Sequence, residues 1–130
     1  MKGDDIAERL LEFAARIVKL GGALPQSTVG KHICLQLIRS GTSLGANYEE
    51  ARGAESKADF IHKLGISLKE LRETRYWLSI IVRTALVPPK RMNEIMREAD
   101  SLCRILGRSI LTAKQRAAPI QGQPRTAEQE

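Results

Sequence analysis

Cysteine and aromatic residues are scarce in this sequence. Its 130 residues include two cysteines, Cys34 and Cys103, and aromatic residues make up 4% of the chain. The cysteines are too few for a disulfide framework and lack CxxC spacing, which argues against a secreted mini-domain and a structural zinc site. The low aromatic content argues against a surface that reads single-stranded nucleic acid sequence-specifically by base stacking.

Long apolar runs are also missing. No stretch approaches the ~20 apolar residues that a membrane-spanning helix needs. Met1 is followed by a charged segment rather than by the apolar core of a signal peptide. We therefore expect a cytoplasmic protein with no membrane association, and at ~100–200 residues per domain the length predicts one domain.

Catalytic and cofactor-binding motifs are absent as well. The sequence has no GxGxxG, GxxxxGK[ST] or GxSxG motif. His32 and His62 have no Cys or His at metal-ligand spacing, and both cysteines fall near apolar stripes, as small core residues do. We therefore expect no enzyme activity, no catalytic residue, no metal site and no cofactor.

The sequence does show a helical period of apolar residues from residue 4 to residue 116. No segment alternates apolar and polar residues as a half-buried strand would, so the predicted fold class is all-α. Gly21-Gly22 is expected to end the first helix. The predicted helices, which favour an antiparallel up-down-up-down bundle over residues 1–116, span about 4–20, 27–52, 56–85 and 89–116. Residues 117–130 contain one large apolar residue and are expected to form a disordered tail.

Local signals refine two of these helices. Ser56 opens a capping-box pattern at the start of the third helix. Gly41 and Gly45 each cost about 1 kcal/mol in a helix, so we expect a neighbouring helix to approach closely there. The inward stripe of the second helix is expected to comprise Val29, Ile33, Leu37, Leu44, Tyr48 and Ala51.

The third helix carries apolar residues on two faces. One stripe, which includes Leu71, Leu78 and Val82, is expected to face the core. The apolar residues projected away from the main stripes of the third and second helices are Ile66, Trp77, Ile80, Leu35 and Ile38. They form the expected interface of a homo-oligomer, because Trp is enriched at interface anchors. The alternative is a scatter of exposed apolar side chains, which is normal on any surface.

A set of polar residues accompanies these stripes. Arg75 falls within the inward stripe of the third helix, so we expect it to meet a carboxylate, with Glu49 or Glu50 as the candidate partner, or to emerge at an interface. The remaining members are Arg39, Asn47, Glu50, Glu70 and Glu73. They could form a binding groove, but we favour buried ion pairs and hydrogen bonds that set the helix register.

Basic residues follow the outer faces of two helices. The formal charge is +6, and the residues concerned are Arg9 and Arg16 in the first helix and Lys90, Arg97, Arg104 and Arg108 in the fourth. Such a stripe is most often a solvated face. If the chain forms an oligomer, however, the basic stripe is repeated on each subunit and would attract polyanions. We therefore also consider the hypothesis that the protein binds the backbone of RNA or DNA.

Two runs of sequence carry a family resemblance. They are Gln36–Glu50 (QLIRSGTSLGANYEE) and Ser56–Leu78, which includes the run LKELRET over 68–74. Together they resemble the bacterial four-helix-bundle family of proteins encoded in intervening sequences of 23S ribosomal RNA genes, over about Leu10–Ala113. The resemblance implies a left-handed bundle, assembly as a homopentamer and no established enzyme activity. Accessory proteins of diversity-generating retroelements are similar bundles that bind a reverse transcriptase and nucleic acid.

Two functions therefore stay open. The first is a non-enzymatic homo-oligomeric bundle that binds nucleic acid through its basic faces. One form of this hypothesis makes the protein an accessory to a reverse transcriptase. The second is a protein-interaction scaffold whose basic surface is incidental.

Overall fold

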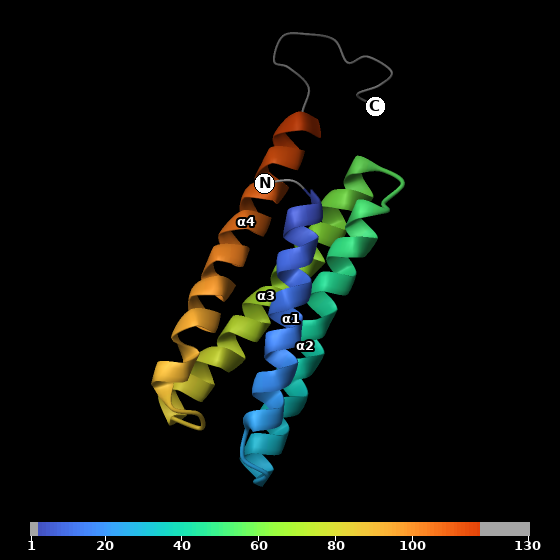
Figure 1. Ribbon diagram of the computed structural model, residues 1–130. Helices are drawn as coiled ribbons and strands as arrows, with labels where there is room; N and C mark the ends of the chain where they lie inside the picture. The colour runs from blue at the N-terminus through green and yellow to red at the C-terminus, as the bar shows by residue number, and fades with distance from the viewer. Residues whose placement is uncertain (1–2, 118–130) are drawn as a thin grey trace, which may run out of the picture.

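Four α-helices make up most of the part of the chain that the structure describes (Figure 1). The computed structural model describes residues 3–117, and no strand occurs among them. The elements are α1 (Gly3–Ala23), α2 (Thr28–Arg52), α3 (Lys57–Thr84), the 3₁₀ turn η1 (Pro89–Met92) and α4 (Asn93–Ala117). The all-α prediction is confirmed. The tail expected over 117–130 lies, apart from Ala117, outside the described residues.

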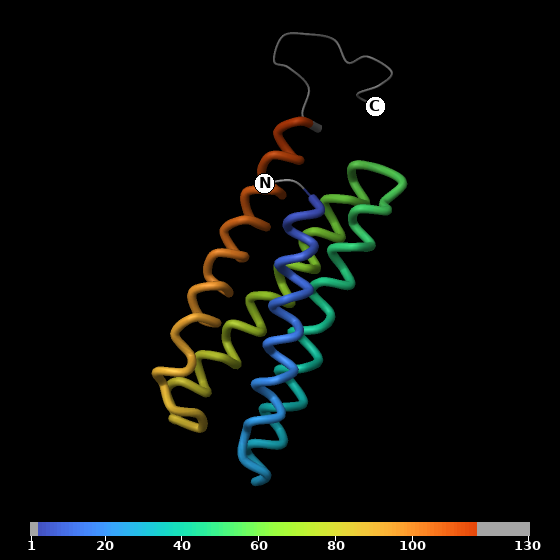
Figure 2. Tube along the Cα trace, viewed as in Figure 1, coloured from blue at the N-terminus to red at the C-terminus, as the bar shows by residue number. Residues whose placement is uncertain are grey.

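Successive helices run in opposite directions, as the tube in Figure 2 shows. Each helix packs along the next one in the chain, and α1 also contacts α4, so the four helices form a closed bundle. The contact between α1 and α4 is the least extensive of the four. This side of the bundle is therefore the one with most room for grooves between helices.

The core is built from one stripe on each helix. In α1 the stripe consists of Ile6, Leu10, Phe13 and Ile17, whose spacing of four, three and four residues keeps them on one helical face. All four are at most 5% exposed. The largest fully buried side chains of the other helices include Leu37, Leu44, Leu64, Leu71, Leu78, Ile81, Leu102 and Leu106.

Side-chain caps fix the starts of α2 and α3. Ser27 Oγ accepts a hydrogen bond from Gly30 N at 3.1 Å, and Ser56 Oγ accepts one from Asp59 N at 3.1 Å. The expected cap at Ser56 is thus confirmed. At the other end of α3, Ala85 adopts a left-handed conformation with φ 52°, which lets the chain turn toward η1.

Glycines bring α1 and α2 close together. A Cβ atom on Gly41 would lie 2.6 Å from Ile17 Cγ2, so the expected close approach is found at this position. At Gly45 the nearest atom would be Leu10 Cβ at 3.8 Å, which is ordinary contact. The prediction that Gly21-Gly22 ends the first helix is wrong. Gly21 is buried, and a Cβ atom there would lie 3.0 Å from Ile38 Cδ1 of α2, which is a tight contact. The glycine therefore lies at a close contact with α2 within the helix, and α1 continues to Ala23.

Two details of the expected stripes also need correction. Val29 is 57% exposed rather than buried, because the chain before α2 packs over Gly30, where an added Cβ would collide with the carbonyl oxygen of Pro25. Near the end of α3, Ile81 is fully buried whereas Val82 is half-buried. Two turns of an α-helix take about 7.2 residues, so apolar residues repeated every seven residues shift gradually around the helix. Over the 28 residues of α3 this shift moves the buried position from the one expected to its neighbour.

Candidate functional site

Buried hydroxyl groups join α2 to α3. Ser40, Ser67 and Thr74 are each 0% exposed. The Thr74 hydroxyl donates to Ser40 Oγ at 2.9 Å, and the Ser67 hydroxyl donates to the carbonyl oxygen of Leu44 at 2.6 Å. No buried side-chain nitrogen or oxygen in the described residues lacks a partner. Because these bonds have fixed partners, they set the register of the two helices. The sequence signal for them is the presence of small polar residues at inward positions.

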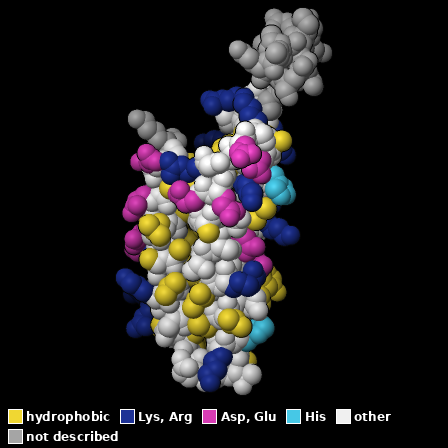
Figure 3. Space-filling model, turned by 90° about the vertical axis from the view of Figure 1, so that its right-hand side faces the viewer, with side chains coloured by type: hydrophobic (Ala, Val, Ile, Leu, Met, Phe, Trp, Pro, Cys, Tyr) yellow, Lys and Arg dark blue, Asp and Glu magenta, His cyan; other side chains and the backbone are white. Residues whose placement is uncertain are grey.

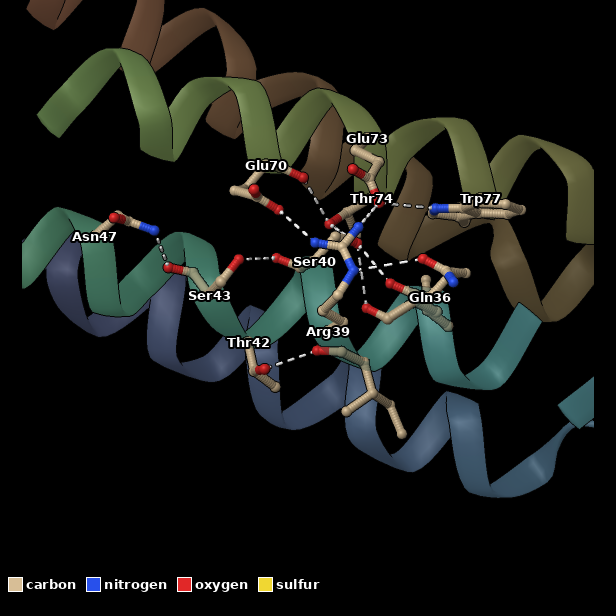
Figure 4. Close-up of polar contacts among 12 residues, drawn as sticks. Gln36, Arg39, Ser40, Thr42, Ser43, Asn47, Glu70, Glu73, Thr74 and Trp77 are labelled. Carbon is tan, nitrogen blue, oxygen red and sulfur yellow. Dashed lines mark hydrogen bonds and ion pairs between the residues drawn. The ribbon is translucent and has the colours of Figure 1, made fainter. Parts of the chain in front are cut away.

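A cluster of polar side chains lies beside the hydroxyl groups of Ser40 and Thr74, between α2 and α3 (Figure 4). Arg39 lies at its centre: Nη1 is 3.5 Å from Glu70 Oε2, Nη2 pairs with Glu73, and Nε donates to Gln36 Oε1 at 3.4 Å. Trp77 Nε1 donates to Glu73 Oε2 at 3.2 Å. We call Gln36, Arg39, Glu70, Glu73 and Trp77 the Arg39 cluster.

The Arg39 cluster differs from the expected set in membership and burial. Asn47 Nδ2 donates to the carbonyl oxygen of Ser43 at 2.9 Å within α2, and Glu50 pairs with Lys63 at 3.3 Å. Neither residue therefore belongs to the cluster. The ion pairs are also not buried, since the Arg39 side chain is 49% exposed. The guanidinium group is engaged by three partners, which supports the interpretation that the cluster ties α2 to α3.

Arg75 meets a carboxylate, as expected, but the candidate partners Glu49 and Glu50 are wrong. Arg75 Nη1 lies 3.5 Å from Asp100 Oδ1 of α4. Glu50 lies beside Lys63, and Arg75 is twelve residues further along α3, which corresponds to about 18 Å of helix. Position 75 therefore borders α4, and its side chain, 39% exposed, reaches solvent at that boundary.

The two arginines of α1 face α4 rather than solvent alone. Arg9 Nη2 lies 2.5 Å from Glu98 Oε1 and 3.1 Å from Ser101 Oγ, and the hydrogen bond with Glu98 raises the pKa of Arg9. Arg16 lies 3.9 Å from Glu94. Both arginines help to hold α1 against α4, so we leave them out of the candidate interface.

The cations expected at the start and middle of the fourth helix are exposed. Arg97 Nε donates to the carbonyl oxygen of Asn93 at 3.3 Å, and Lys90 lies in η1, near the start of the helix. Beyond Asp100, α4 contains no acidic residue and four cations, Arg104, Arg108, Lys114 and Arg116. This half of the helix is therefore the most strongly basic continuous surface that we find on α4.

A cleft of about 690 Å³ lies along this basic half of α4, on the side that faces the start of α1 and α3. We call it the α4 cleft. Its charged lining residues are Arg104, Arg108 and Arg116, and none of its lining residues is acidic. Apolar side chains of Ile6, Tyr48, Phe60 and Ile105 also line it. The sequence stripe did not include Arg116, because only the helix packing shows that it borders the same cleft.

Exposed apolar side chains gather on a different side. Leu11 and Val18 of α1 are 64% and 47% exposed, and Leu35 of α2 is 66% exposed. With half-buried Ile38 they form what we call the α1–α2 apolar face, and Figure 3 shows hydrophobic side chains grouped on the side of the molecule viewed there. By contrast, Trp77 and Ile80 pack against the core, and Ile66 is half-buried. Of the residues expected at a subunit interface, Leu35 is thus the most accessible.

Residues 3–117 contain both cysteines and side chains of the types that could ligate a metal. No group of three or more His, Cys, Asp or Glu side chains in this range could hold a metal ion. No helix in the same range is long and apolar enough to cross a membrane. Both cysteines are free and half-buried, and burial raises the pKa of Cys103 against the lowering effect of the nearby guanidinium groups of Arg75 and Arg72.

Comparisons with known proteins agree with this architecture. A crystal structure of a protein of unknown function from the S23 ribosomal protein family of Bacteroides thetaiotaomicron VPI-5482 is 40% identical in sequence, with a TM-score of 0.79. The similarity covers 85% of this chain and 99% of that one. No curated protein matches significantly. The family model described as 23S rRNA-intervening sequence protein matches residues 4–108, and neither description names an enzyme activity. The chain therefore belongs to the family of 23S rRNA-intervening sequence proteins.

Proposed function

We propose that this protein is a non-enzymatic helical bundle that binds the backbone of RNA or DNA through the outer face of α4. The observation that carries the proposal is the basic half of α4, where four cations and no acidic residue follow Asp100. Arg104 and Arg108 are exposed and border a cleft without a carboxylate. Arg104 also borders a second hollow, whose lining includes Glu94, Glu98 and Asp100. Exposed arginines bind phosphates and release counterions.

The helix dipole explains the presence of some cations near the end of α4 without any ligand. Lys and Arg in the last turn interact favourably with the helix dipole, and this accounts for Lys114 and Arg116. The effect falls off within one turn, so it does not account for Arg104 and Arg108. These two arginines are therefore the most informative residues to change.

The test is a charge reversal with a matched control. One variant carries Arg97→Glu, Arg104→Glu and Arg108→Glu. The control carries Lys57→Glu, Lys69→Glu and Arg83→Glu, which are exposed positions of α3. Both variants have a formal charge of zero instead of +6, so a difference between them reports position rather than total charge. Affinity for unrelated RNA and DNA is measured by gel shift and fluorescence anisotropy from ~50 mM salt upward.

We expect the α4 variant to lose affinity and the slope of log K against log salt to flatten by about one unit per lost phosphate contact. The α3 control should bind more nearly as the unmodified protein does. Equal losses of affinity in both variants would mean that binding depends on the total charge of the protein and not on the position of the arginines in α4. Absence of binding by the unmodified protein at ~50 mM salt would contradict the proposal itself.

Self-association is a second part of the proposal. Leu11, Val18 and Leu35 expose large apolar side chains on adjacent helices, and such patches mark interaction sites more often than isolated residues do. The family resemblance implies a ring of five subunits, which would multiply the +6 charge on one particle. Light scattering behind a sizing column should show a mass several times that of the 14.4 kDa chain, and Leu35→Glu should reduce it. A monomer would contradict this part.

The same apolar face favours a second candidate function, a protein-interaction scaffold whose basic surface is incidental. A reverse transcriptase is the partner that the resemblance to retroelement accessory proteins implies. A reverse transcriptase gene beside this one, together with copurification of the two proteins, would support the accessory role. A scaffold without a nucleic-acid role would bind its partner equally well with the α4 arginines reversed.

A further inference from the structure

We propose that the α4 cleft receives one unpaired nucleotide of a single nucleic-acid strand. This inference rests on the proposed function and adds a strand preference to it. The phosphates would lie on Arg104, Arg108 and Arg116, while the base would pack against Phe60 and Ile105. The shape, the charge and the apolar wall of the cleft each support this assignment.

The cleft is large enough for a nucleotide, and its lining distinguishes it from other hollows of similar volume on the molecule. Its volume of about 690 Å³ falls within the range of ~300–1,000 Å³ that is usual for small-molecule sites. Three arginines border it, and no carboxylate lines it. A cleft that served only a duplex backbone would need these cations but no apolar wall.

The apolar wall fits a base. Phe60 lies in the first turn of α3, remains half-buried after packing against the core, and lines the cleft. Stacking on an aromatic ring is tolerant of base identity, because every base has a π-face. In a duplex the bases are already stacked, so a paired nucleotide would first have to be flipped out. Single strands should therefore bind more tightly than duplexes with equal numbers of phosphates.

The polar lining indicates weak base selectivity. The Ser101 hydroxyl accepts from Arg9 at 3.1 Å, and the Ser109 hydroxyl donates to the carbonyl oxygen of Ile105 at 2.9 Å. The lining contains no Asn, Gln, Asp or Glu side chain, and its arginines are assigned to phosphates rather than to the edge of a base. We therefore expect discrimination between single and paired strands rather than between sequences.

The experiment compares two labelled probes by fluorescence anisotropy, a ten-nucleotide oligo-dT and a hairpin duplex with the same number of phosphates. Phe60→Leu should weaken oligo-dT binding about 5- to 150-fold, the loss expected for one base without its stacking ring, and leave duplex binding unchanged. Phe60→Tyr keeps the ring and should bind like the unmodified protein. Ser109→Leu narrows the cleft without changing any charge and should also weaken only oligo-dT binding, so the test survives if Phe60→Leu unfolds.

The outcomes separate this inference from the proposed function. Equal affinity for both probes, with no selective effect of Phe60→Leu or Ser109→Leu, would overturn the cleft assignment while the backbone-binding function stands. Binding of neither probe at ~50 mM salt would overturn both. Selective loss of oligo-dT binding, restored by Phe60→Tyr, would support both.

Discussion

The close approach of α1 and α2 at Gly41 allows a quantitative prediction. In Gly41→Ala the new Cβ would stand 2.6 Å from Ile17 Cγ2, a distance at which an atom must move. Ile17 is 0% exposed, so it has little room to yield. Overpacking of this kind costs about 1–3 kcal/mol, whereas replacing a helical glycine by alanine gains about 1 kcal/mol. We therefore expect a net loss of about 0–2 kcal/mol in the free energy of unfolding.

Gly45→Ala is the matched control, because it gains the same helix propensity and places Cβ in ordinary contact at 3.8 Å from Leu10 Cβ. It should be stabilised by up to about 1 kcal/mol, so the two variants should differ by about 1–3 kcal/mol. Urea unfolding followed by circular dichroism, at one fixed protein concentration, measures this difference.

A second substitution tests the cause of the difference. Ile17→Leu moves the branch from Cβ to Cγ and so removes the Cγ2 atom that collides with alanine at position 41. It should restore much of the stability lost in Gly41→Ala, which gives a positive coupling in a double-mutant cycle. Equal stability of Gly41→Ala and Gly45→Ala would refute the reasoning, because the two helices would then not be held at this separation.

Three further predictions concern helix ends and buried groups. Ala85→Gly should raise the free energy of unfolding by about 1 kcal/mol, because alanine at φ 52° is strained and glycine is not. If urea unfolding shows no gain in stability, the left-handed conformation at this position is contradicted. Thr74→Val should lower the free energy of unfolding by about 1 kcal/mol, because the hydrogen bond to Ser40 is lost. Unchanged stability would mean that this bond does not stabilise the α2–α3 pair. In a Cys34→Ser background, the pH midpoint for alkylation of Cys103 should lie above that of a free cysteine thiol measured under the same conditions, because burial raises the pKa of Cys103. The stability that Cys103 contributes is therefore lost as pH rises from its unfolded-state pKa through its folded-state pKa, and a midpoint at or below that of the free thiol would contradict the burial.

Periodicity was sufficient to predict the core of α1. The spacing of four, three, four and three residues predicts that Ile6, Leu10, Phe13, Ile17 and Leu20 face the core; the first four are buried, and Leu20 at the end of the stripe is half-buried. A stripe on one helix can be predicted without knowledge of the neighbouring helices. The same holds for the cap at Ser56, whose bond to Asp59 is local. Such features depend on residues within a few positions of one another.

The ion pairs could not be predicted in the same way. Arg9 pairs with Glu98 across 89 residues, and Arg75 pairs with Asp100 rather than with a residue of α2. Both partners depend on which helices lie side by side and at what height. The cleft is a similar case, since Phe60 and Arg116 become neighbours of one site only through the packing of α3 and α4.

The salt dependence of nucleic-acid affinity tests the central claim most directly. For the unmodified protein we predict that log K for unrelated RNA and DNA falls linearly with log salt, with a slope of about −2 to −4 if three or four α4 cations contact phosphates. Reversal of Arg97, Arg104 and Arg108 should remove most of that slope. No binding at ~50 mM salt, or a slope unchanged by the reversal, would contradict the assignment of α4 as the nucleic-acid-binding surface.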